Sequence, residues 1–202
     1  MSRRLISVVL AAVLGLLPFR VWATSVVPPD FDTLVNDADY VVRAVVKSVT
    51  SEWKETAGHK YIGTKVQLEI QEIVRGKPPQ TLTLEMVGGR VGQDALIVEG
   101  APQFLVGDED ILFVQGNGKQ VYPLVAIMHG RYPVYHDAQS GTEYVVRSNG
   151  MPLYSEQDVS LPMTALSSVK VQNPAAKPMT VAAFEQKIRA VNPASARAEQ
   201  LR

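Results

Sequence analysis

The side chains best suited to chemistry are three histidines, His59, His129 and His136. They form no His-x-x-x-His or HExxH pattern, and no carboxylate stands at ligand spacing from them along the chain. His129 and His136 could meet across a hairpin, but a zinc site needs further ligands. Exposed loop histidines are therefore the favoured interpretation, and the sequence predicts neither a metal nor a cofactor.

The acidic run Asp108-Glu109-Asp110 lacks the twelve-residue calcium-loop pattern with its distal glutamate, which favours a solvated turn. The chain also has no GxSxG elbow, no GxxxxGK[ST] loop and no GxGxxG motif after a strand. A nucleophile, a base and oxyanion donors cannot be assembled from what remains. The protein is therefore predicted not to be an enzyme.

The chain contains no cysteine, which excludes thiolate chemistry, cysteine zinc sites and a disulfide framework. Arg3-Arg4 precede an uncharged run over 5–17, and small residues stand at Val21 and Ala23. This pattern predicts a signal peptide over 1–23, with an uncleaved anchor as the alternative. We expect a periplasmic or secreted protein that begins at Thr24 and has no stable membrane insertion after cleavage.

The whole chain carries 20 basic and 20 acidic side chains. The predicted signal peptide holds three arginines and no acid, so its removal leaves a net charge of −3. A mildly acidic chain without a basic tract lacks the electrostatic signature of a nucleic-acid-binding protein. We therefore expect no nucleic-acid partner.

The strand at 64–76 is the element around which the predicted sheet is organised. Thr64, Val66, Leu68 and Ile70 alternate strictly with polar residues, as expected for a half-buried strand. The alternation changes phase at Glu72, which predicts a β-bulge that bends a long strand. Such a strand can belong to two parts of a curled sheet.

The remaining pattern predicts a helix over 30–39 capped by Asp30, and a helix after Thr180. Further strands are predicted over 40–49, 81–86, 95–99, 111–114 and 121–127, with a polar hairpin connection over 51–59 and a later hairpin over 132–147. Many short strands with glycine turns predict a mainly β fold, an OB-like small closed β-barrel with a short N-terminal and a C-terminal helix. The barrel domain is placed at 24–147, and an irregular connector, helix and tail at 148–202.

The segment Asp37-Ala38-Asp39-Tyr40-Val41-Val42-Arg43-Ala44 resembles the opening strand of netrin-like domains, the OB-fold modules of tissue inhibitors of metalloproteinases. The strand over 64–73 and the segments 104–108 and 111–114 continue the likeness in the same order. The resemblance covers about 31–127 and rests on strand alternation and a few glycines. The chain also resembles small exported bacterial proteins that share the elements at 100–104 and 107–108, whose role is unassigned.

The netrin-like resemblance implies binding to a secreted metalloprotease. In that family an N-terminal cysteine meets the protease zinc, but this chain has no cysteine and its predicted mature end is Thr24. A wedge formed by Thr24, Ser25, Val26 and Val27, stiffened by Pro28-Pro29, could still enter a cleft. Trp53 is expected to be either a lid on the barrel mouth or a partner contact.

The sequence therefore predicts an exported, non-enzymatic binding module with a protein partner, and an inhibitor or regulator of a secreted metalloprotease is its most specific form. The contacts would come from the loops 51–59, 88–94 and 116–120. A structural or assembly protein of the bacterial cell envelope is the alternative, and a carrier of a small apolar ligand is a third class. The oligomeric state is not predicted.

Overall fold

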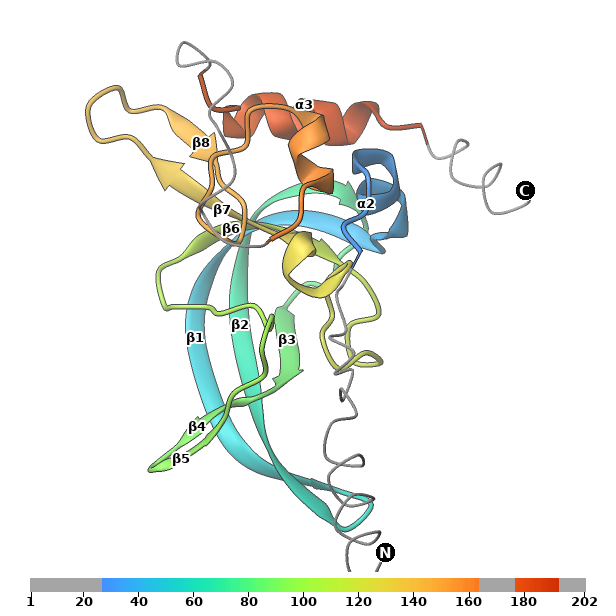
Figure 1. The fold of residues 1–202 in the computed structure, drawn as a ribbon, viewed down its shortest axis with the longest axis vertical. Helices are drawn as coiled ribbons and strands as arrows, with labels where there is room; N and C mark the ends of the chain where they lie inside the picture. The colour runs from blue at the N-terminus through green and yellow to red at the C-terminus, as the bar shows by residue number, and fades with distance from the viewer. Residues whose placement is uncertain (1–26, 164–176, 193–202) are drawn as a thin grey trace, which may run out of the picture.

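The computed structural model describes residues 27–163 and 177–192 and shows a mainly β protein (Figure 1). Six strands form one antiparallel sheet in the order β3-β2-β1-β6-β7-β8, and β4 and β5 form a separate two-stranded ladder. The strands are β1 (Tyr40–Thr56), β2 (His59–Gly76), β3 (Leu82–Val87), β4 (Gly89–Val91), β5 (Asp94–Leu96), β6 (Glu109–Val114), β7 (Arg131–His136) and β8 (Glu143–Val145).

The longest elements, β1 and β2, form one hairpin that extends away from the helices at the opposite end of the molecule (Figure 1). Ala57 and Gly58 make its turn with φ angles of 47° and 79°, the left-handed pair that a two-residue hairpin favours. The predicted polar connection over 51–59 is therefore wrong, because most of it is strand. Backbone pairing between the strands and the ion pair between Lys65 and Glu52, at 3.0 Å, stabilise this arm. Residues 51–56 therefore need no apolar stripe to form a strand.

The bulge predicted where the β2 pattern changes phase is confirmed. Gln71 has no partner in β1, because Arg43 pairs with Glu72 and the next residue, Ala44, pairs with Ile70. This extra residue reverses the facing of the residues that follow it up to Val74, which is a second residue without a partner because Val42 pairs with Ile73 and Val41 with Arg75. Val66 and Leu68 consequently pack on one face of the sheet, whereas Val74 is buried on the other.

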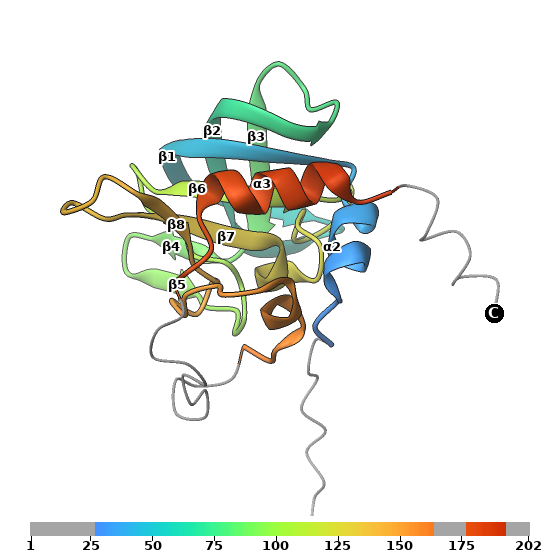
Figure 2. The same ribbon diagram turned by 90° about the horizontal axis from the view of Figure 1, so that it is seen from above.

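The sheet separates two hydrophobic cores. The inner core, on what we call the inner face, contains Tyr40, Val42, Ala44, Val46, Val66, Leu68, Leu82, Leu84, Met86, Phe104, Leu112, Val114 and Leu124. The helical core, on the helix-covered face, is built around Val41, Ile111, Phe113, Tyr132 and Val145. Against it pack α2 (Phe31–Asp37) and α3 (Val181–Ala190), which confirms both predicted helices (Figure 2).

The helices are fixed by their caps and by one aromatic side chain. Asp30 accepts from Thr33 N at 2.7 Å, and Thr180 accepts from Ala183 N at 3.3 Å, as expected for N-caps. Phe184 of α3 is fully buried, with its ring 5.1 Å from that of Tyr132 and 5.8 Å from that of Phe31. It therefore joins both helices to the sheet.

Arg75 ties the end of α3 to the sheet. Its Nη1 donates to the Val191 carbonyl at 2.8 Å, and its Nη2 donates to Asn36 Oδ1 at 3.2 Å. The last carbonyls of a helix have no partner within the helix, so a cation placed there satisfies them. One β2 side chain thus connects both helices.

A strand predicted over 121–127 is wrong. Within it only Leu124 bridges to Val114, and the chain then turns into the 3₁₀ helix η1 (Ile127–Gly130). Ala126 and Ile127 have φ angles of 46° and 58°, a left-handed conformation that ends an extended run. The apolar residues of this segment reflect burial in the core and not pairing with a neighbouring strand.

The two edges of the sheet, β3 and β8, are not joined by a ladder among the residues that the structure describes. The β8 edge is covered instead by the following segment, because Val145 N donates to the Met179 carbonyl at 2.9 Å. The 3₁₀ helix η2 (Glu156–Ser160) adds buried Val159 to the helical core. Described residues after 147 therefore share a core with the strands before them.

A candidate binding cleft on the inner face

A half-open cleft of about 410 Å³ lies on the inner face of the sheet. Strands β1, β2 and β3 form its floor, the β4–β5 ladder forms one wall, and the segment 97–104 forms the other. The lining is mostly apolar and consists of Val49, Ser51, Thr64, Val66, Met86, Val87, Gly88, Gly89, Arg90, Ala95, Leu96, Ile97, Val98, Ala101, Pro102, Gln103, Phe104 and Tyr122. Arg90 is the one charged residue in this lining.

The β4 wall approaches the floor through a glycine. A Cβ at Gly89 would lie 2.3 Å from Thr64 Oγ1 and 2.4 Å from Ser51 Oγ, and the φ angle of Gly89 is 128°. The two hydroxyls are 2.8 Å apart, and Thr64 Oγ1 also donates to the Gly88 carbonyl at 2.6 Å. Only glycine fits this crossing, because a side chain would separate the wall from the floor.

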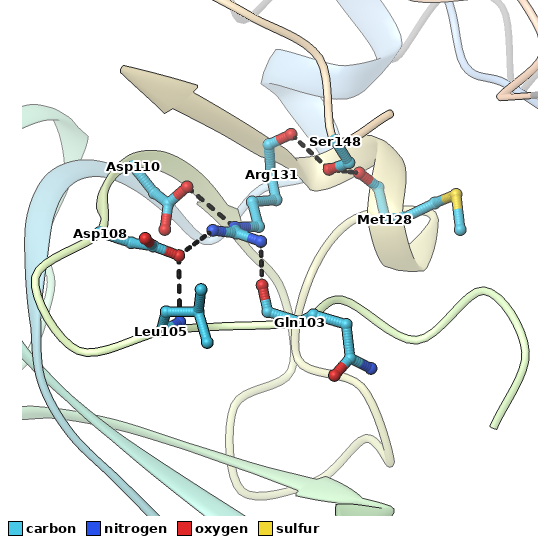
Figure 3. A network of polar contacts seen from close by, with 7 residues as sticks. All are labelled: Gln103, Leu105, Asp108, Asp110, Met128, Arg131 and Ser148. Carbon is cyan, nitrogen blue, oxygen red and sulfur yellow. Dashed lines mark hydrogen bonds and ion pairs between the residues drawn. The ribbon is translucent and has the colours of Figure 1, made fainter. Parts of the chain in front are cut away.

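Arg131 of β7 holds the opposite wall in place (Figure 3). Its Nε donates to Asp110 Oδ1 and its Nη2 to Asp108 Oδ2, both at 2.8 Å, and its Nη1 donates to the Gln103 carbonyl. The guanidinium also lies 4.5 Å from the ring centre of Phe104. Gln103 and Phe104 belong to the wall segment, Asp108 lies in the turn after it and Asp110 lies in β6, so one side chain fixes the position of the wall.

Asp110 is fully buried, and burial raises the pKa of its carboxyl from 3.8 to about 6, although the charge of Arg131 opposes the rise. Its Oδ2 has no hydrogen-bond partner. The predicted solvated turn at 108–110 is therefore wrong for Asp110. Asp110 can be buried because it pairs with Arg131. Arg131 lies far along the chain, and no sequence pattern links it to the acidic run.

The predicted contact residues are not gathered at this cleft. Thr24, Ser25 and Val26 lie outside the described residues, and Val27 is 81% exposed. Trp53 lies in β1 opposite Ile62, is 51% exposed and is not part of the lining. Of the three predicted contact loops, 88–94 contributes most, through Gly88, Gly89 and Arg90.

The three histidines do not lie in loops, as the sequence had favoured. His59 begins β2 and His136 ends β7, and both are exposed. His129, in η1, is 2% exposed, and burial together with the nearby charge of Arg147 lowers its pKa to about 4. None of the three lines the cleft.

The chemistry of the cleft is set by a few polar side chains among apolar ones. Its polar side chains are two hydroxyls, an amide, a phenol and a guanidinium, and its lining contains no histidine or carboxylate that could serve as a base. An apolar cleft with a few fixed polar groups is the usual form of a ligand or segment binding site. The feature of the sequence that could have indicated this cleft is the glycine pair at 88–89, because glycine in a strand often marks a close approach of two backbones.

No protein-family model matches the chain, and no curated protein matches it either. Among the described residues, no helix has the length and apolar character that a membrane-crossing helix requires.

Proposed function

We propose that the protein is an exported, non-enzymatic binding module that holds an extended apolar segment of a protein partner in the inner-face cleft. The observation that carries this proposal is the cleft itself, with apolar walls and one charged lining residue. Arg90 favours a partner segment that places an acidic group beside it. Apolar contact supplies the affinity, and this pairing sets the direction of the segment.

The outer edge of the cleft supports a protein rather than a small molecule as occupant. Ile97 lines the cleft and is 80% exposed, while Leu105 and Val106, on the same connecting segment, are 70% and 67% exposed. Exposed apolar side chains on a segment that continues from a cleft wall are a feature of interaction surfaces. Because Arg131 holds this segment in place, little conformational entropy is lost when a partner binds.

The most specific form of the proposal is an inhibitor or regulator of a secreted metalloprotease. It rests on the netrin-like resemblance and on the wedge at 24–27, of which Val27 is exposed. N-terminal sequencing of protein recovered from the producing cell tests the export step, and Thr24 is the expected first residue. A protein that extends the N-terminus beyond Thr24 should lose inhibition if the wedge acts.

The OB-like barrel belongs to the same proposal. Asn117 Nδ2 donates to the Thr83 carbonyl at 3.0 Å, and the Tyr122 hydroxyl donates to the Val87 carbonyl at 3.0 Å. These contacts bring the segment after β6 to the open edge of β3. They support a sheet that is closed by side chains on this side.

The decisive experiment is capture of partners from periplasmic and secreted fractions, with protein that begins at Thr24. Ile97→Asp places a charge in the cleft edge, and Ile73→Asp changes an exposed isoleucine outside the lining. The proposal expects one partner whose capture is lost with Ile97→Asp and retained with Ile73→Asp, both variants being folded by circular dichroism. Equal capture by both variants contradicts the cleft as the binding site.

If the partner is a metalloprotease, titration of its activity should end at one molecule of inhibitor per enzyme. Recovery of envelope components in a large particle would replace the proposal with the assembly function.

A further inference from the structure

A second cluster of chemically active side chains lies on the helix-covered face, at the exposed ends of β6, β7 and β8. Glu109, His136 and Glu143 each offer one ligand atom, and these atoms all lie within 4.8 Å of one another. His136 and Glu143 are paired directly across β7 and β8. A paired position on two strands fixes the separation of its side chains, so the cluster is part of the sheet and not of a mobile loop.

Arg43 of β1 orients the two carboxylates. Its Nε lies 2.5 Å from Glu109 Oε1, and its Nη2 lies 2.8 Å from Glu143 Oε2. Each glutamate therefore uses one oxygen on the guanidinium and turns the other towards His136. Glu109 Oε2 lies 2.9 Å from Nε2 of the ring, and Glu143 Oε1 lies 3.4 Å from Nδ1.

The two ring contacts differ in kind. A neutral imidazole carries one N–H, so it can donate to only one of the two carboxylates. The 2.9 Å contact to Glu109 has the length of an N–H···O hydrogen bond, whereas the 3.4 Å contact to Glu143 is longer than such bonds usually are. With the proton on Nε2, the Nδ1 lone pair faces a carboxylate oxygen, and either a second ring proton or a metal cation between these two atoms makes that arrangement favourable.

We propose that Nδ1 of His136 and Oε1 of Glu143 bind a zinc ion. With Zn–N and Zn–O bonds of about 2.0–2.1 Å, the edge of a tetrahedral site measures about 3.4 Å, which matches the separation of these two atoms. Glu109 is then the carboxylate that accepts from the other ring nitrogen, the usual second partner of a zinc-bound histidine. Water completes the coordination, because His136 is 56% exposed.

The ligand types select the ion. A neutral imidazole with a carboxylate suits zinc, whereas calcium and magnesium prefer sites made of oxygen ligands alone. The two glutamates and Arg43 leave one net negative charge beside the ring, which attracts a cation. The inference does not depend on the cleft, which is lined by other residues.

The test is a zinc titration of the full-length mature protein, followed by NMR of the histidine ring resonances. We expect the His136 resonances to shift saturably with Zn²⁺ and to stay in place with equal Mg²⁺ or Ca²⁺. His59→Gln is the matched control, because it removes another exposed strand-end histidine and should leave the titration unchanged. The buried His129 provides an internal reference whose resonances should not move.

The variants separate ligands from the orienting group. Glu143→Gln and His136→Gln should abolish the saturable shift or the binding that it reports, whereas Glu109→Gln should weaken zinc binding by about 10–100-fold. Glu69→Gln, an exposed strand glutamate paired with Lys47, is the carboxylate control and should bind zinc as the wild type does. An absent shift, an equal response to Mg²⁺, or full binding by Glu143→Gln would each overturn the zinc site.

Discussion

Asp110 and His129 are predicted to give opposite pH dependences to the stability of this protein. The pKa of Asp110 is raised from 3.8 to about 6 by burial, so its contribution is fully present below pH 3.8 and is lost as the pH rises through 6. The pKa of His129 is lowered from 6.5 to about 4 by burial and by Arg147. Its contribution is present above pH 6.5 and is lost as the pH falls towards 4.

The two effects have similar size. Between the folded and unfolded chain the pKa of Asp110 differs by about 2 units and that of His129 by about 2.5 units. One unit corresponds to about 1.4 kcal/mol, so the two effects are at most about 3 and about 3.5 kcal/mol. Between pH 7 and pH 4 they therefore nearly cancel in the wild type. Asp110→Asn leaves only the loss from His129, so its free energy of unfolding should fall by about 3 kcal/mol more than that of the wild type over this range. His129→Leu should show the opposite difference.

The assay is urea unfolding at pH 4, 5, 6 and 7, followed by circular dichroism for the wild type and the two variants. Each variant changes the absolute stability, so the quantity compared is the change of its free energy of unfolding with pH relative to the wild type. The other carboxylates contribute to all three proteins and drop out of this difference. Three parallel pH profiles would refute the reasoning, because they would mean that neither buried group titrates differently in the folded chain.

Three further predictions concern the fold. Gly89→Ala should destabilise the protein by about 1–3 kcal/mol more than Gly92→Ala. Both glycines have a positive φ, so both substitutions cost backbone strain of about 1–2 kcal/mol, but only the methyl group at position 89 would also meet the hydroxyls on the cleft floor. Equal losses in urea unfolding would contradict the close crossing. Phe184→Ala should cost about 3–5 kcal/mol in the same assay, since its ring is fully buried between both helices and the sheet, and a loss below 1 kcal/mol would argue against that packing. Arg75→Ala should cost about 1.5–3 kcal/mol and speed hydrogen exchange in the last turn of α3, and unchanged exchange there would show that Arg75 does not cap the helix.

Local patterns in the sequence predicted the elements that bury one face. The helices at α2 and α3, their caps and the bulge in β2 all follow from residues within a few positions of one another. The outer half of the β1–β2 hairpin was missed for the opposite reason. Its stability comes from backbone pairing and cross-strand ion pairs, so residues 51–56 carry the polar composition of a loop.

The sites were harder to predict because their residues meet only through the sheet. Arg131 reaches Asp110 across 21 positions, and His136 meets Glu143 because of the hairpin register. Neither spacing matches a motif that a sequence alone displays. The favoured interpretation of exposed loop histidines was wrong for His129 for a similar reason, because η1 begins a new element in which His129 turns into the protein interior.

The bulge at Gln71 explains why β2 can line a cleft on one face of the sheet and contribute to the helical core on the other. Before the bulge, the even-numbered residues of β2 face the inner core, and beyond it Val74 faces the helical core. Without the extra residue, Val74 would face the inner core, and the helical core would lose the buried side chain that β2 contributes to it. The inner face of the outer hairpin thus remains available for the cleft, while the other end of the sheet is covered by helices. The phase change in β2, which is readable in the sequence, therefore lets one strand line the cleft and also contribute to the helical core.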